Sequence, residues 1–105
     1  MQHTLRNNIN VSGSGIHTGV KTSVIMKPAD IDTGIVFIRT DLAHHTKIKA
    51  DIDNVHSTSR STVLKKEDAE IHTVEHILAA IVGAQIDNII IEVDNIEIPI
   101  LDGSS

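Results

Sequence analysis

The sequence predicts an α+β fold, a two-layer sandwich in which a mainly antiparallel sheet packs against one strong helix. Two observations predict it. Several segments alternate apolar and polar residues or run almost continuously through Ile and Val, as strands do. One segment, residues 73–83, instead repeats its apolar residues at helical spacing. One apolar helix and an apolar sheet face are both buried when the helix packs on the sheet.

The composition limits the size of the domain and its chemistry. The chain has 105 residues, enough for one small domain over residues 1–105. Phe37 is the only aromatic residue, so the core must be aliphatic. There is no Cys, which excludes disulfides and thiolate metal sites. Seven His and fourteen acidic residues still permit a metal site made of imidazole and carboxylate ligands.

The charge pattern argues against nucleic acid as a partner. The net charge is −5, no basic cluster is longer than Lys65-Lys66, and aromatic residues for base stacking are lacking. The N-terminal residues 1–8 have no apolar core of a signal peptide. The longest apolar run, residues 77–82, is too short to span a bilayer. These features predict a cytoplasmic protein without a transmembrane segment.

The first third of the chain predicts a hairpin. Residues 3–11 alternate apolar and polar side chains and predict a half-buried strand. A Gly-rich connection over 12–19 leads to a second strand at 20–27, which Pro28 ends. His17 lies at the tip of this hairpin. It could face a ligand there, although a polar loop residue without such a role is the more common case.

The middle of the chain predicts short strands joined by polar connections. Residues 34–39 are almost continuously apolar and predict a central strand covered on both faces. His44 and His45 predict a solvated loop, because neighbouring side chains rarely face one metal. The remaining segments are expected to be a short strand at 48–52, a ligand-accessible polar loop at 54–60, a strand at 61–64 and a charged turn at 65–68. The fold leaves room for a second helix within residues 52–61.

After the helix, the sequence predicts one more strong strand. Residues 88–93 are rich in Ile and lead into an Asp94-Asn95 turn. Residues 97–101 predict an edge strand or extended segment, because Pro99 cannot donate to a strand ladder.

The predicted helix over residues 73–83 has recognisable ends. Thr73 is a candidate N-cap, since its hydroxyl can accept from an amide of the first turn. Gly83 is a candidate for the left-handed residue that ends a helix. The expected buried stripe consists of Val74, Ile77, Leu78, Ile81 and Val82.

Glu75 and His76 lie in the first turn of this helix, off the buried stripe. The helix dipole stabilises a carboxylate there and disfavours imidazolium, so His76 tends to stay in its neutral, metal-binding form. A carboxylate beside a neutral imidazole suits metal-assisted hydrolysis. The pair could equally be an ordinary first turn, and the dipeptide alone favours that interpretation. His72 would complete a two-ligand helix face only if the helix began before Thr73.

Two segments carry most of a family resemblance. They are Thr73-Val74-Glu75-His76-Ile77-Leu78-Ala79-Ala80 and Glu97-Ile98-Pro99-Ile100-Leu101-Asp102-Gly103-Ser104. Shorter segments at 13–19, 28–29, 33–39 and 87–89 agree with them in order along the whole chain. Together they resemble the N-terminal domain of the UDP-3-O-acyl-N-acetylglucosamine deacetylases, zinc enzymes of the committed step of lipid A biosynthesis and hence of Gram-negative outer-membrane biogenesis.

The resemblance implies a hydrolase with zinc (Zn²⁺) as its cofactor. His76 would be one of the zinc ligands, and Glu75 would be the general base for the water that zinc activates. The water would attack the N-acetyl carbonyl of UDP-3-O-acyl-N-acetylglucosamine and release acetate. His72 matches none of the ligands of the family.

The same resemblance points to three candidate substrate-binding residues. Ile16 and His17 match a loop near the active site of the family, so they are expected to help hold the substrate. Thr58 lies in a segment that matches a variable region on the acyl-binding side of relatives.

The chain also departs from the family. The resemblance implies a second domain that supplies a His and an Asp as further zinc ligands, in a His-Lys-x-x-Asp motif that this sequence lacks. Because catalytic zinc normally has about three protein ligands, the chain alone is expected to be inactive. A different class of function also remains open, namely a non-catalytic binding or self-associating module on the same fold, since the second domain would otherwise cover an apolar face.

Overall fold

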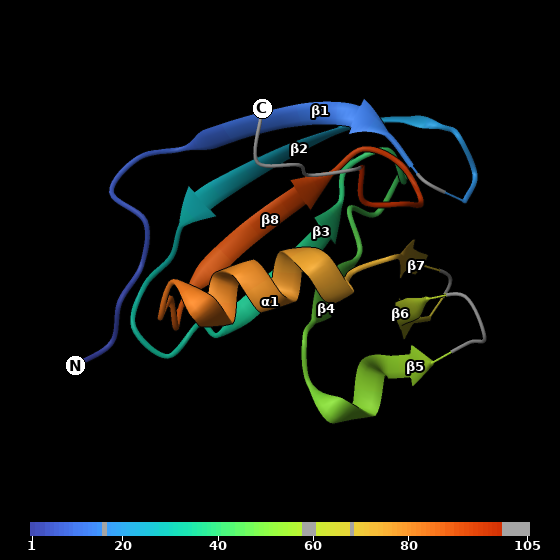
Figure 1. Ribbon diagram of the computed structural model, residues 1–105. Helices are drawn as coiled ribbons and strands as arrows, with labels where there is room; N and C mark the ends of the chain where they lie inside the picture. The colour runs from blue at the N-terminus through green and yellow to red at the C-terminus, as the bar shows by residue number, and fades with distance from the viewer. Residues whose placement is uncertain (16, 58–60, 68, 100–105) are drawn as a thin grey trace.

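The computed structural model describes residues 1–15, 17–57, 61–67 and 69–99 (Figure 1). The larger sheet contains β1 (Ile9–Ser14), β2 (Lys21–Pro28), β3 (Ile35–Arg39), β4 (Lys47–Lys49) and β8 (Ile89–Val93). The smaller sheet contains β5 (Val55–Ser57), β6 (Thr62–Lys66) and β7 (Ala69–His72). The helix is α1 (Glu75–Gly83), and a short 3₁₀ turn, η1 (Ile52–Asn54), precedes β5.

The larger sheet has the strand order β1-β2-β8-β3-β4. Its neighbours pair antiparallel except for β3 and β8, which are parallel. The chain between β3 and β8 carries the smaller sheet and α1, and α1 lies across one face of the larger sheet (Figure 1). The predicted α+β fold and the hairpin of the first two strands are therefore confirmed.

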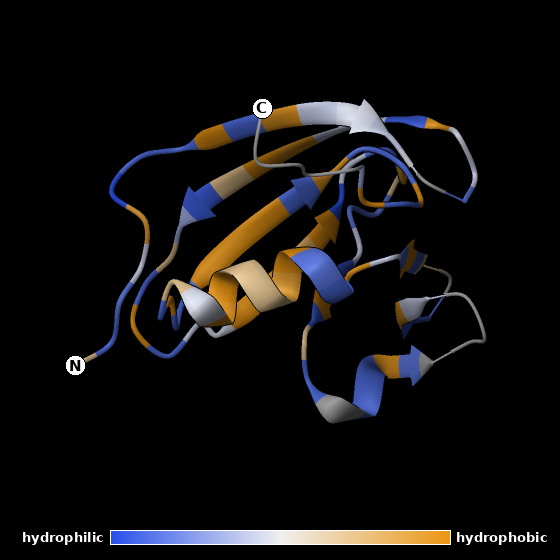
Figure 2. Cartoon of the chain, in the orientation of Figure 1, coloured by the Kyte–Doolittle hydropathy of each residue, from blue (hydrophilic) through white to orange (hydrophobic). Residues whose placement is uncertain are grey.

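The strand register explains where the core lies. Met26 pairs with Ile91, Ile91 with Phe37, and Phe37 with Ile48, which gives one apolar row across four strands. Figure 2 shows this apolar character along β8 and β3 behind the helix. Ile77 and Ile81 of α1 belong to the same buried cluster. The core is aliphatic around a single Phe, as the composition predicted.

The opposite face of the larger sheet is less deeply buried by the described part of the chain. Val36 and Ile38 of β3 and Ile90 of β8 are half-buried, whereas Phe37 is fully buried. The strand predicted at 34–39 is confirmed, but the expectation that both of its faces are covered is wrong for these residues. The middle strand of the sheet is β8 rather than β3.

A buried arginine joins the two sheets. Arg39 of β3 is 6% exposed and donates from Nη1 to the carbonyl oxygen of Glu70 in β7 at 2.6 Å. Its Nε and Nη2 donate to the two carboxylate oxygens of Asp41 at 2.8 and 2.6 Å. These hydrogen bonds, opposed by burial and aided by the charge of Arg39, lower the pKa of Asp41. The small sheet is thus held against the end of β3.

Several sequence predictions need correction. Residues 3–8 are not strand, and β1 instead extends to Ser14, so the loop that follows it is shorter than expected. Within 52–61 the structure has only η1 and β5 in its described part, so the second helix is wrong there. Of the segment 97–101, predicted as an edge strand or an extended segment, the described residues 97–99 form no strand beyond an isolated bridge of Glu97 with His72, and residues 100–101 lie outside the described residues.

The helix ends also differ from the prediction. The N-cap residue is Val74, without a side-chain cap, and the Thr73 hydroxyl donates to Glu97 instead. The hydroxyl therefore donates to a tertiary carboxylate and does not serve as an acceptor for the first-turn amides. Gly83 is the last helical residue, and the left-handed conformation falls at Gln85 (φ 60°). The buried stripe is narrower than expected, because Val82 is 67% exposed.

No helix in the described part of the chain is long and apolar enough to cross a membrane. The cytoplasmic location stays a prediction.

Candidate functional site

Three segments that are distant in sequence meet at one buried carboxylate. They are the loop that follows β1, the turn just before α1, and the segment that begins at Glu97. Glu97 is fully buried. The Oε2 atom accepts from the Thr73 hydroxyl at 2.6 Å and from the His17 amide at 3.1 Å. The Oε1 atom accepts from the Thr18 amide at 2.8 Å and from the Thr18 hydroxyl at 2.7 Å.

Gly15 leaves the space that this carboxylate occupies. A Cβ atom at position 15 would collide with the end of the Glu97 side chain, lying only 2.6 Å from its Cδ. The loop then closes on itself, as the Gly15 amide donates to Val20 O at 2.9 Å and the Gly19 amide donates to Gly15 O at 3.0 Å. Gly19 has φ +73°, which glycine adopts without steric cost. Both glycines therefore allow the loop to fold closely around Glu97.

Hydrogen bonds from three residues stabilise the charge of Glu97. Burial by itself would raise the pKa of Glu97. The hydrogen bonds donated by Thr73, Thr18 and His17 outweigh burial and lower the pKa from 4.5 to about 2. The carboxylate is therefore ionised at any pH at which the protein is expected to work.

This lowered pKa predicts acid-sensitive stability. The stabilisation is fully present above about pH 4.5, the pKa in the unfolded chain, and is lost as the pH falls toward 2. At about 1.4 kcal/mol per pKa unit, the loss from Glu97 amounts to about 3 kcal/mol. We expect Glu97→Gln to lower the free energy of unfolding at pH 6 and to flatten its fall below pH 4.5, measured by urea denaturation. Parallel pH curves for both proteins would contradict the assignment.

Glu75 and His76 occupy the first turn of α1, as predicted. Glu75 is half-buried, and its Oε1 accepts from the Thr62 amide of β6 at 3.1 Å. The amides of Thr73 and Val74 donate to the Thr62 carbonyl at 3.0 and 3.2 Å. This exchange of hydrogen bonds fixes the start of the helix on the small sheet. The side chain of His76 is exposed.

His72 does not share a helix face with His76. It ends β7, and its Nε2 lies 3.1 Å from the Glu70 carboxylate. The prediction that the helix begins after His72 is therefore confirmed. In Figure 2 the first turn of α1 is the hydrophilic end of an otherwise apolar helix.

The described residues do not complete a zinc site. Within them, no group of three or more His, Cys, Asp or Glu side chains is placed to hold a metal ion. His76 can offer one exposed imidazole, with the Glu75 carboxylate beside it in sequence. The donor set thus fits a partial site, which other ligands would have to complete.

The predicted substrate-binding residues are only partly placed. His17 is exposed, and its backbone amide is held by Glu97. Ile16 and Thr58 lie outside the described residues. Sequence reasoning missed Glu97 as part of the site, although it opens one of the two segments that carry the family resemblance. The available signal was an acidic residue between Ile96 and Ile98, which suggests burial with compensating donors.

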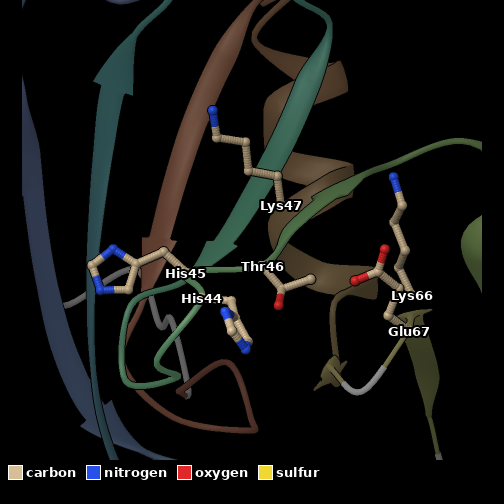
Figure 3. A pocket seen from close by; sticks show the side chains of 6 residues that line it. All are labelled: His44, His45, Thr46, Lys47, Lys66 and Glu67. Carbon is tan, nitrogen blue, oxygen red and sulfur yellow. The ribbon is translucent and has the colours of Figure 1, made fainter.

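A separate cavity of about 310 Å³ lies beside the loop that contains His44 and His45. It is lined by His44, His45, Thr46, Lys47, Lys66 and Glu67. Figure 3 shows the side chains of Lys47 and His45 pointing away from Lys66 rather than toward a common point. Both His residues are exposed, as the sequence predicted for a solvated loop. The cavity adds no residue to the site around Glu97.

Comparison with known proteins gives one consistent result. The sequence model of the family described as UDP-3-O-acyl N-acetylglycosamine deacetylase matches residues 2–105. The chain is 49% and 46% identical, over 104 residues, to the UDP-3-O-acyl-N-acetylglucosamine deacetylases of Thioalkalivibrio sulfidiphilus and Marinobacter nauticus. Each match covers 99% of this chain and 34% of the relative.

A bifunctional enzyme LpxC/FabZ of Chlorobaculum tepidum is 46% identical over 104 residues, which are 99% of this chain and 22% of that enzyme. The chain therefore spans about a third, or less, of the length of these curated relatives.

Proposed function

Because the chain belongs to the UDP-3-O-acyl N-acetylglycosamine deacetylase family, we propose that it is the N-terminal part of a zinc-dependent deacetylase of lipid A biosynthesis. The substrate would be UDP-3-O-acyl-N-acetylglucosamine, the compound in the names of its relatives. One structural observation carries the proposal: an exposed imidazole, His76, follows a half-buried carboxylate, Glu75, at a fixed helix start.

The position of Glu75 suits a general base. It lies in the first turn of α1, where the helix dipole attracts a negatively charged group. The Thr62 amide holds its Oε1 atom at 3.1 Å, and a carboxylate held in this way can take a proton from water. His76 follows it in the same turn, and its exposed imidazole can bind a metal. A bound zinc would polarise the amide carbonyl and lower the pKa of water.

The remaining ligands would have to come from the part of the relatives that this chain does not match. The outward face of α1 is a suitable contact for it. Five exposed residues lie on it, and four of them are small or apolar: His76, Ala79, Ala80, Val82 and Gly83. Small side chains allow another element to approach closely. We therefore infer that the C-terminal portion packs on this face and completes the site, and that the isolated chain is inactive.

A chimera tests this function directly. Residues 1–105 are joined to the C-terminal two-thirds of the Thioalkalivibrio sulfidiphilus relative. We expect the chimera to bind one zinc and release acetate from the substrate, and the isolated chain to do neither. His76→Ala in the chimera should remove both zinc and activity, because the site loses a ligand.

His44→Ala is the matched control, since His44 is also exposed but lies in a loop outside α1. It should keep zinc content and turnover unchanged. Zinc content and acetate release are measured on the same samples. A folded chimera without activity, or a His76→Ala variant that keeps its zinc, would contradict the proposed function.

A second candidate function rests on the same exposed face of α1. With Val82 67% exposed, the isolated chain could instead be a self-associating module. Sedimentation at several protein concentrations distinguishes the two candidate functions. A monomer at all concentrations argues against self-association, whereas a stable dimer that buries α1 supports it.

A further inference from the structure

The buried Glu97 carboxylate connects two functional segments that have no hydrogen bond to each other among those described. On one side it accepts from Thr73, which lies two residues before Glu75. On the other side it accepts from the amides of His17 and Thr18. One carboxylate therefore holds both the start of the catalytic helix and the loop that carries the candidate substrate-binding His17.

This arrangement costs folding free energy in two ways, through a buried charge and through a strained backbone. Glu97 is fully buried, and no Lys or Arg of the described residues pairs with it. Thr73 has φ +63°, which a β-branched residue rarely adopts. Its hydroxyl bond to Glu97 and its amide bond to the Thr62 carbonyl hold it in that conformation. Strained backbone and a buried charge together beside candidate catalytic residues suggest a role in function.

We propose that Glu97 is a positioning residue, which sets the Glu75–His76 turn against the His17 loop through Thr73 on one side and the His17 and Thr18 amides on the other. The inference rests on the proposed function. Glu97 touches neither substrate nor reacting atoms in this role. It acts by fixing the distance between the segment that performs the chemistry and the segment that holds the substrate.

Glu97 has two sets of hydrogen bonds: the Thr73 arm, from the Thr73 hydroxyl, and the Thr18 arm, from the amide and hydroxyl of Thr18. We expect the two arms to affect different kinetic constants, whereas a purely structural role would not separate them. Loss of the Thr73 arm should disturb the helix start and lower kcat, by about tenfold to a hundredfold, with little change in KM. Loss of the Thr18 arm should loosen the loop of His17 and raise KM by about tenfold, with little change in kcat.

The experiment uses the chimera with Thr73→Val and Thr18→Val, which keep the side-chain shape and remove the hydroxyl donor. Thr73→Ser restores the donor and should restore kcat. Thr4→Val is the matched control: the Thr4 hydroxyl donates to the Asn88 carbonyl at 2.5 Å, in a region away from these segments. That variant should lose stability without a change in kcat or KM. Glu97→Gln should affect both constants, provided that it folds.

Amide hydrogen exchange in the isolated chain supplies a readout that does not need activity. Protection of the His17 and Thr18 amides should fall in Glu97→Gln and in Thr18→Val, and stay unchanged in Thr4→Val. If the chimera is active but Thr73→Val and Thr18→Val leave kcat and KM at their original values, the inference is overturned and the proposed function stands. If the unsubstituted, folded chimera is inactive, the proposed function fails and the catalytic role of Glu97 fails with it.

Discussion

Glu75→Gln in the chimera is expected to lower kcat by about a thousandfold, the range that a positioned general base contributes. Glutamine has the same shape and can still accept from the Thr62 amide, which lies 3.1 Å from Oε1 in the native protein. It cannot take a proton from water. The loss should therefore appear in kcat while the substrate still binds, measured as acetate release against substrate concentration.

Two controls accompany this result: the free energy of unfolding of the Glu75→Gln variant, and the kcat of a variant with a surface substitution. Removal of the first-turn charge should cost no more than about 1 kcal/mol of unfolding free energy, the usual size of a helix-dipole interaction. Glu67→Gln changes an exposed carboxylate in the turn after β6 and should leave kcat unaltered. A Glu75→Gln enzyme with near-normal kcat would show that the base lies elsewhere, and Glu75 would then be only a favourable first-turn charge.

Gly15→Ala is expected to lower the free energy of unfolding by about 3 kcal/mol, because the added methyl group and the Glu97 carboxylate cannot occupy the same space. The neighbouring atoms belong to a buried side chain held by hydrogen bonds to Thr73, Thr18 and His17. Either the loop or the carboxylate must move, and the buried bonds are then lost. Urea denaturation of the isolated chain at pH 7 measures the effect.

Gly83→Ala is the matched control, with the opposite sign expected. Gly83 is the last residue of α1, its φ is not positive, and a Cβ there would meet nothing within 4 Å. Alanine is preferred in helices, so the variant should be more stable by up to about 1 kcal/mol. Equal effects of the two substitutions would mean that position 15 is not close-packed against Glu97.

Local pattern was sufficient for most of the elements. The hairpin strands, the apolar strands at the positions of β3 and β8, and the helix were predicted because their apolar residues repeat at the period of a strand or a helix. Glu75 and His76 were placed in the first turn of α1 for the same reason. Burial of β3 on both faces was predicted wrongly, since an apolar run does not reveal whether a second layer exists to cover it.

The helix ends show why local rules fail next to a buried site. The sequence marks Thr73 as a cap, because its hydroxyl is within reach of the first-turn amides. In the structure that hydroxyl donates to Glu97, a charged acceptor 24 residues away. That bond, together with the bond that the Thr73 amide donates to the Thr62 carbonyl, holds Thr73 at φ +63°, so Thr73 lies outside the helix and the N-cap falls at Val74.

By itself, the sequence determined the fold class, the position of the candidate catalytic pair Glu75 and His76 on a helix, and the family to which the chain belongs. Each of these depends on residue types at short spacing or on matched segments. Only the tertiary structure decided that Glu97 joins Thr73 to His17 and Thr18, and that Gly15 makes room for it. The physical reason is distance along the chain: His17 and Glu97 are 80 residues apart, and only the packing of the strands and the helix brings them together.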